Sequence, residues 1–385
     1  MNPVLAKLGV TIFDRMSRLA AETGAINLGQ GFPDAPGPED VRARAADLVL
    51  NGSNQYPPMR GLPELRQAAA EHYRRFQGLD LDWRSEILVT SGATEALAAS
   101  ILALISPGDE VVLFEPLYDA YVPLVKLAGG VPRFVRLAPP NWRVTRAALE
   151  AAFTPHTRLV ILNNPVNPAA RVFDAEEIAL VAEACARADS IAICDEVWEH
   201  IVFDGRAHQS LIAAPDMRAR AVKIGSIGKM FGLTGWKVGL ICAAPELIDA
   251  IAKAHQFLTF TTPPNLQGAA AYGLGLPPAH FSAMREDLAR SRDRLSAGLT
   301  AAGYRILPSE GTYFLNVDLA ASGWAGDDVS FCERAATEAG VASIPVSAFF
   351  DTDPVRHIVR LCFSKQDATL DEAIVRLARF RRAFG

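Results

Sequence analysis

Lys229 is the residue of this sequence whose surroundings most clearly indicate chemistry. It lies in Gly225-Ser226-Ile227-Gly228-Lys229, directly after the apolar run 221–224, which predicts a strand that ends in a glycine-rich loop. In open α/β sheets, ligands bind beyond the carboxyl ends of the strands. The lysine amine forms Schiff bases with carbonyl compounds, and Ser226 and Lys237 are near enough in the sequence to bind one phosphate. These residue types suit a cofactor with a carbonyl and a phosphate, and pyridoxal 5′-phosphate (PLP) fits.

The Gly228-Lys229 pair has two other interpretations. A P-loop would need glycine where Lys223 stands and serine or threonine where Met230 stands, so this chain lacks that motif. An ordinary surface lysine in a glycine-rich turn is the commoner explanation for a motif this short. The rest of the chain decides against it, because residues with matching chemistry follow other predicted strands.

Two of these strand ends could bind other parts of the cofactor. Asp195 follows the apolar run 190–194, and a carboxylate there could keep the ring nitrogen protonated, as an electron sink requires. The alternative is that Asp195 caps the following segment. The turn Ser91-Gly92-Ala93-Thr94 joins a predicted strand to a helix, whose free N–H groups favour an anion such as a phosphate. Packing alone would also select small residues there.

Three residues could act on the substrate or on the cofactor ring. Asn167, in an Asn-Pro turn, could donate to the cofactor's phenolic oxygen and to a substrate carboxylate. Tyr118 could stack on the pyridine ring, or it could pack in the core. Arg360 lies in the apolar run 359–363, where a buried guanidinium needs an anion. That anion is either the substrate α-carboxylate or a structural ion-pair partner.

A metal site is not expected. Glu199 and His200 stand together, but no second ligand follows at helical spacing, so we expect solvated side chains there. The five cysteines are scattered without a CxxC pair, which favours reduced thiols and argues against zinc. We therefore predict a protein without a metal.

Composition limits the class of protein. With 385 residues the chain should form two domains, and its net charge of -5 without a basic block argues against nucleic acid or an anionic membrane as partner. The first 18 residues lack an apolar signal region, and no window is apolar enough to span a membrane. We expect a cytoplasmic protein.

The hydrophobic pattern predicts the architecture. Strand-like runs alternate with helix-like runs, so we expect an α/β fold with a seven-stranded, mostly parallel sheet flanked by helices. A long helix over 281–302 then leads into a smaller α+β domain. We assign residues 1–40 to an N-terminal arm and part of the small domain, 41–280 to the large cofactor-binding domain and 281–385 to the small C-terminal domain. The predicted strands are 86–90, 110–114, 131–137, 158–163, 190–194, 221–225 and 238–243.

A longer set of motifs keeps one order along the chain: Gly31-Phe32-Pro33-Asp34, Asn54-Gln55-Tyr56, Ser91-Gly92-Ala93-Thr94-Glu95, Asn167-Pro168, Asp195-Glu196-Val197, Ser226-Ile227-Gly228-Lys229 and Arg360-Leu361-Cys362-Phe363. This order resembles the class I/II aminotransferases of PLP fold type I. Within that family it is most similar to the branch of kynurenine–oxoglutarate, glutamine and methionine transaminases and cysteine-S-conjugate β-lyases. The motifs extend from about residue 29 to 363, nearly the whole chain.

The resemblance implies a homodimer with two active sites at the interface. It places Tyr56 on the neighbouring subunit's cofactor phosphate, with Ser226 and Lys237 from the home subunit. The apolar stretch 257–260, which ends in Phe260, would line the partner's pocket. It also implies that Gly31 belongs to the substrate site, with Asn167 and Arg360.

Two positions depart from the family pattern. The family has Asn-Pro-Thr-Gly-Lys where this chain has Asn167-Pro168-Ala169-Ala170-Arg171, so a loop glycine is missing. The family commonly has a tyrosine that donates to the cofactor's phenolic oxygen three residues after the aspartate, and here that position is Trp198.

We therefore predict a PLP-dependent aminotransferase that moves an amino group from an L-amino acid to a 2-oxo acid. Lys229 would bind the cofactor and carry the proton. Phe32, Tyr56 and Phe260 suggest apolar or aromatic substrates, with methionine, glutamine and kynurenine all open. One alternative is β-elimination from cysteine conjugates. Another is a PLP-binding transcription regulator, but we expect no DNA-binding segment before the first motif, at Gly29.

Overall fold

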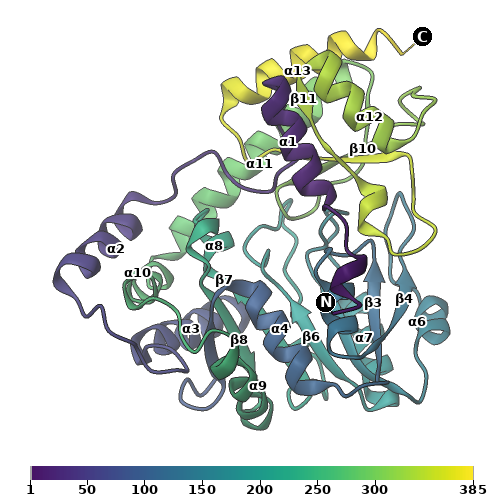
Figure 1. Ribbon diagram of the computed structural model, residues 1–385. Coiled ribbons are helices and arrows are strands. Elements are labelled where there is room, and N and C mark those ends of the chain that lie inside the picture. Colours follow the sequence, from purple (N-terminus) through teal and green to yellow (C-terminus); the bar gives the residue numbers. More distant parts are fainter. Residues whose placement is uncertain (1, 385) are drawn as a thin grey trace.

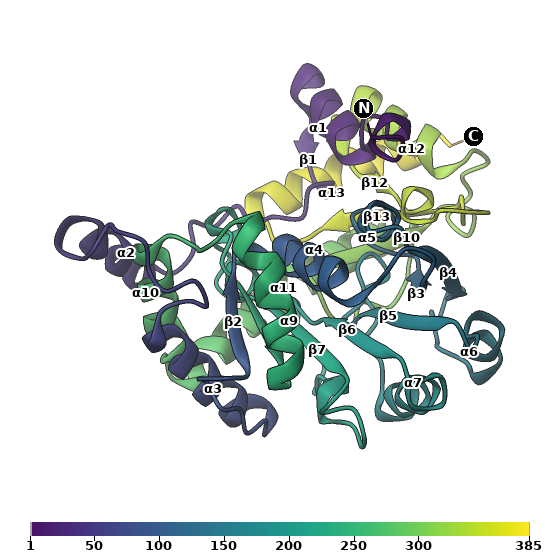
Figure 2. The same ribbon diagram turned by 60° about the horizontal axis from the view of Figure 1, so that its bottom comes forward.

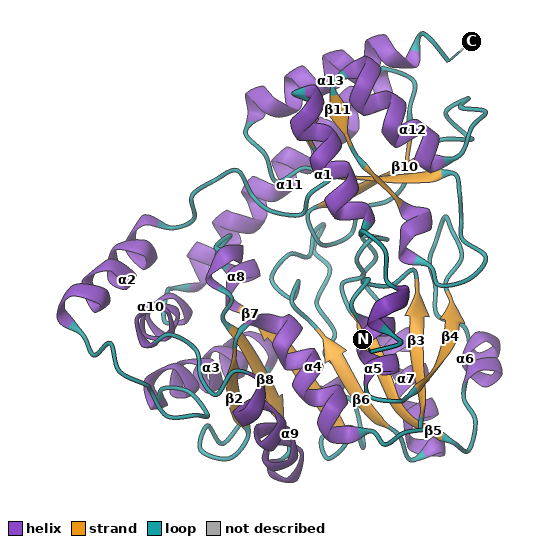
Figure 3. Cartoon of the chain, in the orientation of Figure 1, coloured by secondary structure: helices purple, strands orange, loops and turns teal. Residues whose placement is uncertain are grey.

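The computed structural model describes residues 2–384, and a seven-stranded sheet forms its centre (Figures 1 and 3). The strand order is β2-β8-β7-β6-β5-β3-β4, and only β8 runs antiparallel to its neighbours. All seven strands lie where the sequence predicts them, which confirms the mostly parallel sheet. Their bounds are β2 (Ile87–Thr90), β3 (Glu110–Glu115), β4 (Val131–Arg136), β5 (Thr157–Asn163), β6 (Ile191–Asp195), β7 (Ala221–Ser226) and β8 (Gly239–Ala243).

Helices cover both faces of this sheet (Figure 2). Successive strand residues point to opposite faces, so Leu88 packs in one core and Val89 in the other. One face is covered by α4 (Gly92–Leu104), α5 (Tyr121–Leu127) and α9 (Pro245–Leu258). The opposite face is covered by α3 (Pro63–Gln77), α6 (Arg146–Ala152) and α7 (Ala175–Ala188), while α10 (Pro264–Leu274) packs on α3 and α2 (Glu39–Asn51) packs on α10.

Helix α10 differs from expectation. The pair Pro263-Pro264 looks like an interruption of the pattern, yet Pro264 is the first residue of the helix. Proline is favourable at that position, because its missing N–H would be unpaired in any case. None of the helices within residues 2–384 is long and apolar enough to cross a membrane.

A smaller antiparallel sheet, of order β12-β13-β10-β9, lies beyond the large one. The N-terminal helix α1 (Ile12–Thr23) packs onto it, as Figure 1 shows where the purple α1 lies close to α12 and the yellow α13. The parallel pair of β1 (Ile26–Asn27) and β11 (Val341–Ala342) joins the N-terminal segment to the small C-terminal part of the chain. The remaining elements are β9 (Arg305–Ile306), β10 (Phe314–Asp318), α12 (Asp328–Arg334), β12 (Ile344–Pro345), β13 (Ile358–Cys362) and α13 (Asp367–Arg381).

One helix belongs to both parts of the molecule. Helix α11 (Pro278–Ala301) contributes Phe281 to the core of the large sheet, and Leu295 and Leu299 to the core of the small sheet. The helix begins at Pro278, close to the predicted border at residue 280, and continues through both cores, so it belongs to neither part alone. The residue limits given to the domains stay a prediction.

Candidate active site

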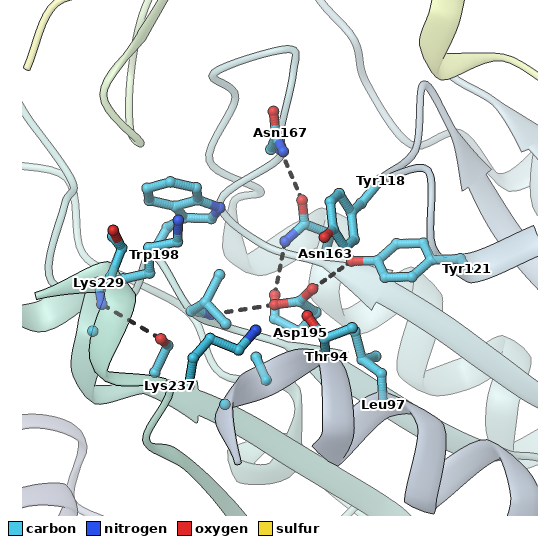
Figure 4. Close-up of a pocket in the computed structure, with 16 residues that line it drawn as sticks. Thr94, Leu97, Tyr118, Tyr121, Asn163, Asn167, Asp195, Trp198, Lys229 and Lys237 are labelled. Atoms are coloured by element: carbon cyan, nitrogen blue, oxygen red, sulfur yellow. Dashed lines mark hydrogen bonds between the residues drawn. The ribbon is translucent and has the colours of Figure 1, made fainter. Parts of the chain in front are cut away.

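A cavity of about 190 Å³ lies at the carboxyl ends of the parallel strands (Figure 4). Every residue predicted to bind the cofactor lines it, except Tyr56. The sheet explains this convergence, since the carboxyl ends of neighbouring parallel strands share one edge. The predicted residues that line the cavity are Gly92, Ala93, Thr94, Tyr118, Asn167, Asp195, Trp198, Ser226, Lys229 and Lys237.

Lys229 lies in the short helix α8 (Ile227–Met230), directly after β7. The Ser226 hydroxyl caps this turn by accepting from the Lys229 backbone N–H at 3.4 Å. The Lys229 Nζ lies 4.8 Å from the ring centre of Trp198 and 3.2 Å from the Tyr313 hydroxyl. Burial lowers the pKa of this amine to about 8. Near neutral pH a useful fraction is therefore neutral, which is the form that attacks a carbonyl.

Asp195 ends β6 as a buried carboxylate (Figure 4). Its Oδ2 accepts from the Tyr121 hydroxyl at 2.5 Å, and its Oδ1 accepts from the Val197 N–H at 3.4 Å. Burial raises the pKa of Asp195, and the hydrogen bond from Tyr121 acts against that rise. Among residues 2–384 no cation forms an ion pair with it. A protonated ring nitrogen in the cavity would supply the missing positive partner.

The amino end of α4 offers a place for an anion. Gly92 has a φ of 79°, and a Cβ there would lie 3.1 Å from the Lys237 Cε, so glycine allows the backbone and this lysine to approach closely. Among residues 2–384 the lysines that form ion pairs are Lys126, Lys223 and Lys365, and Lys237 forms none. Free helix N–H groups beside an unpaired ammonium fit a phosphate.

Arg360 is buried, with 2% of its surface exposed, and it lacks an acid partner. Its Nη1 donates to the Asn167 Oδ1 at 2.7 Å and its Nη2 to the Gly29 carbonyl at 2.9 Å, while its Nε has no partner. Within residues 2–384 no carboxylate forms an ion pair with this guanidinium, so the structural ion pair that we considered is wrong. Burial lowers the pKa of Arg360 to about 10. A ligand carboxylate would satisfy both the charge and the free donor.

The loop that lacks the family glycine keeps its turn. The Val166 N–H donates to the Arg171 carbonyl and the Ala170 N–H to the Val166 carbonyl, each at 2.8 Å. Ala170 takes the left-handed conformation, with a φ of 56°. An alanine therefore adopts the backbone that a glycine would adopt more readily, and Asn167 stays in place.

The expectation that Glu199 and His200 are solvated is wrong, because both are buried. The fully buried Lys223 places its Nζ 2.5 Å from Glu196 and 2.6 Å from Glu199. His208 contacts the same Glu196 oxygen at 2.8 Å. Glu196, Glu199 and His208 lie close enough to hold a metal ion, but the Lys223 ammonium already pairs with both carboxylates and balances one of their two charges. The cluster is a buried ionic network beneath the cavity.

Four predicted residues do not line the cavity: the buried Arg360 described above, and Tyr56, Phe260 and Gly31. Tyr56 and Phe260 pack edge to face with ring centres 5.7 Å apart, and Tyr56 is 84% exposed. Gly31 does not line the cavity either. Its carbonyl accepts from the Tyr313 hydroxyl, and a Cβ on Gly31 would lie 2.7 Å from the Phe314 ring.

Sequence reasoning missed Tyr121, Asn163 and Tyr313. Tyr121 stands three residues after Tyr118, a spacing that places two side chains on one helical face, and this signal could have found it. Asn163 ends β5 and donates to the Asp195 carbonyl at 2.9 Å. Tyr313 follows no recognisable motif, and only the packing of the two sheets brings it to Lys229.

Comparisons with known proteins agree with this arrangement. The family model described as aminotransferase class I and II matches residues 23–377. Methionine aminotransferase from Escherichia coli (strain K12) is 46% identical over 375 residues, which cover 97% of this chain and 96% of that protein. A probable N-succinyldiaminopimelate aminotransferase from Mycobacterium tuberculosis is 44% identical over 385 residues, covering 97% of each. Human kynurenine–oxoglutarate transaminase 1 is 33% identical over 398 residues, covering 94% of each.

Solved structures extend the likeness to three dimensions. The N-succinyldiaminopimelate aminotransferase from Mycobacterium tuberculosis matches with a TM-score of 0.96 at 44% identity, covering 98% of this chain and 99% of that one. The Escherichia coli protein identified as a methionine aminotransferase matches with a TM-score of 0.95 at 44% identity, with the same coverage. With a cavity whose lysine, buried aspartate and helix end suit PLP, this chain belongs to the class I and II aminotransferases, and it is a transaminase that uses pyridoxal phosphate.

Proposed function

We propose that this transaminase takes the amino group of L-amino acids with apolar side chains, methionine foremost, and transfers it to a 2-oxo acid. The observation that carries the proposal is Arg360, a buried guanidinium with a free Nε and no acid partner among residues 2–384. The α-carboxylate is the group that all amino acids and 2-oxo acids share. A guanidinium binds it with two parallel hydrogen bonds.

The charges around the cavity support an apolar side chain. Within the described chain, Lys229 and Lys237 are the cationic residues that line it. In this proposal Lys229 binds the cofactor's aldehyde carbon, Lys237 its phosphate and Arg360 the α-carboxylate, so no cation remains for a second, distal carboxylate. The relative that is 46% identical carries the name methionine aminotransferase, which agrees with that substrate class.

The cofactor is held at three points in this proposal. The N–H groups of Gly92, Ala93 and Thr94 bind its phosphate, together with Ser226 and Lys237. Asp195 accepts a hydrogen bond from the ring nitrogen and keeps it protonated, and Tyr118 packs against the ring. Asn167 and Trp198, which line the same cavity, would contact the phenolic oxygen. When bound, PLP supplies an aldehyde for covalent attachment of an amine and a ring that withdraws electrons.

The protein groups then bind, orient and move a proton. Arg360 and Asn167 fix the substrate carboxylate, which sets the direction of the Cα–H bond. The Lys229 amine, when it is not bound to the cofactor, would take the Cα proton as a general base. Its pKa of about 8 suits that task, because the proton must be both accepted and returned.

A screen of amino donors tests the substrate class. The PLP-loaded protein would be mixed with single amino acids in the absence of a 2-oxo acid, and loss of the absorption of bound PLP would be followed in a stopped-flow instrument. We expect methionine and aromatic amino acids to react at least about tenfold more efficiently than glutamate, aspartate or N-succinyldiaminopimelate. Faster reaction of a donor with a distal carboxylate would contradict the apolar class. Pyruvate released from a cysteine conjugate without an acceptor would mark β-elimination.

We also propose that the active enzyme is a homodimer in which Tyr56 and Phe260 reach the neighbouring subunit's site. Tyr56 and Phe257 are the most exposed large apolar residues, at 84% and 86%, and they lie in segments that contribute nothing to the cavity of their own chain. Apolar surface of this kind is typical of an interface. Tyr56 would donate its hydroxyl to the partner's phosphate.

Hybrid dimers test whether Tyr56 acts across the interface. A Tyr56→Ala subunit and a Lys229→Ala subunit, co-expressed with different affinity tags, form a hybrid with one site that has both residues intact. At limiting PLP we expect this hybrid to recover about half the wild-type activity per dimer, whereas each parent is weak. The matched control pairs Lys229→Ala with Lys237→Ala, because Lys237 belongs to the home subunit and should give no recovery. If neither hybrid dimer recovers activity, Tyr56 acts within its own chain.

A further inference from the structure

Tyr313 touches the reactive amine, although no sequence motif marks it. It is 1% exposed and lies directly before β10 of the small sheet. Its hydroxyl accepts from the Lys229 Nζ at 3.2 Å and donates to the Gly31 carbonyl. The hydroxyl therefore links the cofactor lysine to the N-terminal loop expected to bind the substrate.

The backbone around Tyr313 is held on two sides. The Thr312 N–H donates to the Ile201 carbonyl at 2.9 Å, and the Phe363 N–H donates to the Tyr313 carbonyl at 3.0 Å. The ring packs edge to face on Trp198, with ring centres 4.5 Å apart. Contacts from the segment after β6 and from the residue after β13 therefore keep the hydroxyl at one point beside Lys229.

The direction of the hydrogen bonds defines what Tyr313 can do. A phenol has one proton, and here that proton is donated to Gly31. Toward Lys229 the oxygen is therefore an acceptor. Burial raises the pKa of Tyr313 well above its usual value, so the hydroxyl stays neutral and is not itself a base. The Lys229 amine donates one N–H to this oxygen and has the Trp198 ring on another side. Its lone pair is therefore free to point into the cavity.

We propose that Tyr313 is a positioning residue that holds the Lys229 amine, once it has left the cofactor, beside the substrate Cα. The Lys229 lone pair then takes the Cα proton, and the electron pair of the broken C–H bond stays on the substrate carbon. Without the acceptor at Tyr313, the long lysine chain samples other rotamers, and the distance to Cα is no longer fixed. The inference rests on the role proposed above for Lys229.

The test compares Tyr313→Phe with wild type and with Tyr304→Phe. Tyr304 is a matched control, because it is also buried and donates to a backbone carbonyl, that of Leu377 at 2.9 Å, within the small domain. The proton-transfer step would be measured in single turnovers with methionine and with methionine deuterated at Cα. We expect the step to slow by about tenfold or more in Tyr313→Phe, with a larger isotope effect and a KM within about twofold of wild type.

A second measurement uses the protein stripped of PLP. The rate at which Lys229 captures added PLP would be recorded against pH, since only the neutral amine reacts. Loss of the acceptor removes a partner that favours the ammonium, so the midpoint should fall in Tyr313→Phe and stay unchanged in Tyr304→Phe. The other groups that influence this amine are unchanged in both variants: Cys362, Arg360, Asp195 and Lys237.

The two proposals fail in different ways. If Lys229→Ala captures PLP covalently as wild type does, the role of Lys229 is wrong. If that variant loses capture but Tyr313→Phe matches wild type in single-turnover rate, isotope effect and pH midpoint, Tyr313 has no positioning role. If Tyr313→Phe and Tyr304→Phe slow the proton-transfer step equally, the inference is also overturned. The slowing would then be a general effect of losing a buried hydroxyl.

Discussion

Lys229→Ala should abolish transamination, with a loss of at least about 10⁴-fold in turnover. The variant loses the amine that we propose binds the cofactor and acts as the base that moves the Cα proton. Binding of PLP without a covalent bond should persist, because the groups proposed to hold its phosphate and ring nitrogen, Lys237 and Asp195 among them, are unchanged. The measurement is amino-group transfer over several turnovers, with PLP content determined in parallel.

Two controls test whether the loss of activity is specific to the Lys229 amine. Lys253→Ala removes an exposed lysine from α9 and should leave turnover unchanged. Small primary amines added at high concentration should restore part of the activity of Lys229→Ala, because the truncated side chain leaves room for a soluble base. Repeated turnovers at a near wild-type rate without an added amine would contradict the assignment of Lys229.

Arg360→Ala should separate substrates that carry a carboxylate from those that do not. We expect kcat/KM for methionine to fall by about 10²- to 10³-fold, the range for a buried pair of a guanidinium and a carboxylate. The amine 3-(methylthio)propylamine has the same side chain without the carboxylate, and its slow reaction should be almost unaffected. We would measure the ratio of the two rates. A loss of folded protein lowers both rates by the same factor and leaves this ratio unchanged.

Arg360→Lys is the matched variant, since it keeps a positive charge but loses the planar pair of donors. It should retain part of the preference for methionine, because a lysine binds the carboxylate as a point charge. If Arg360→Ala lowers the rates with methionine and with the amine by the same factor, the role of the arginine is structural. Its contacts with Asn167 and with the Phe314 ring, 3.8 Å from its guanidinium carbon, would then be its whole role.

Much of the large domain could be predicted from the sequence alone. Runs such as 158–163 and 190–194 are short, apolar and bounded by turn residues, so they specify buried strands whatever packs on them. Lys229, Asp195 and the turn after β2 each follow such a strand, and the carboxyl ends of parallel strands share one edge. Local pattern and sheet topology together therefore bring these residues to one cavity.

Other structural features could not be predicted from the neighbouring residues in the sequence. Helix α10 begins at the second of two consecutive prolines, and the sequence around it cannot distinguish a helix start from a break. Glu199 and His200 look like surface residues, but the ammonium of Lys223, 24 residues away from Glu199, allows Glu199 to be buried. A charge is tolerated in the core only when its partner arrives from elsewhere in the chain.

The sequence by itself determined the seven strands and the family, and it marked Lys229 as the candidate cofactor lysine, because each of these is indicated by short local motifs. Only the tertiary structure decided the surroundings of the reacting groups. Arg360 meets Asn167 across 193 residues, and Tyr313 meets Lys229 across 84, through the packing of the small sheet onto the large one. The local sequence does not predict such contacts. Each residue would fit an ordinary core position equally well, and its partner is defined only when the other element packs against it.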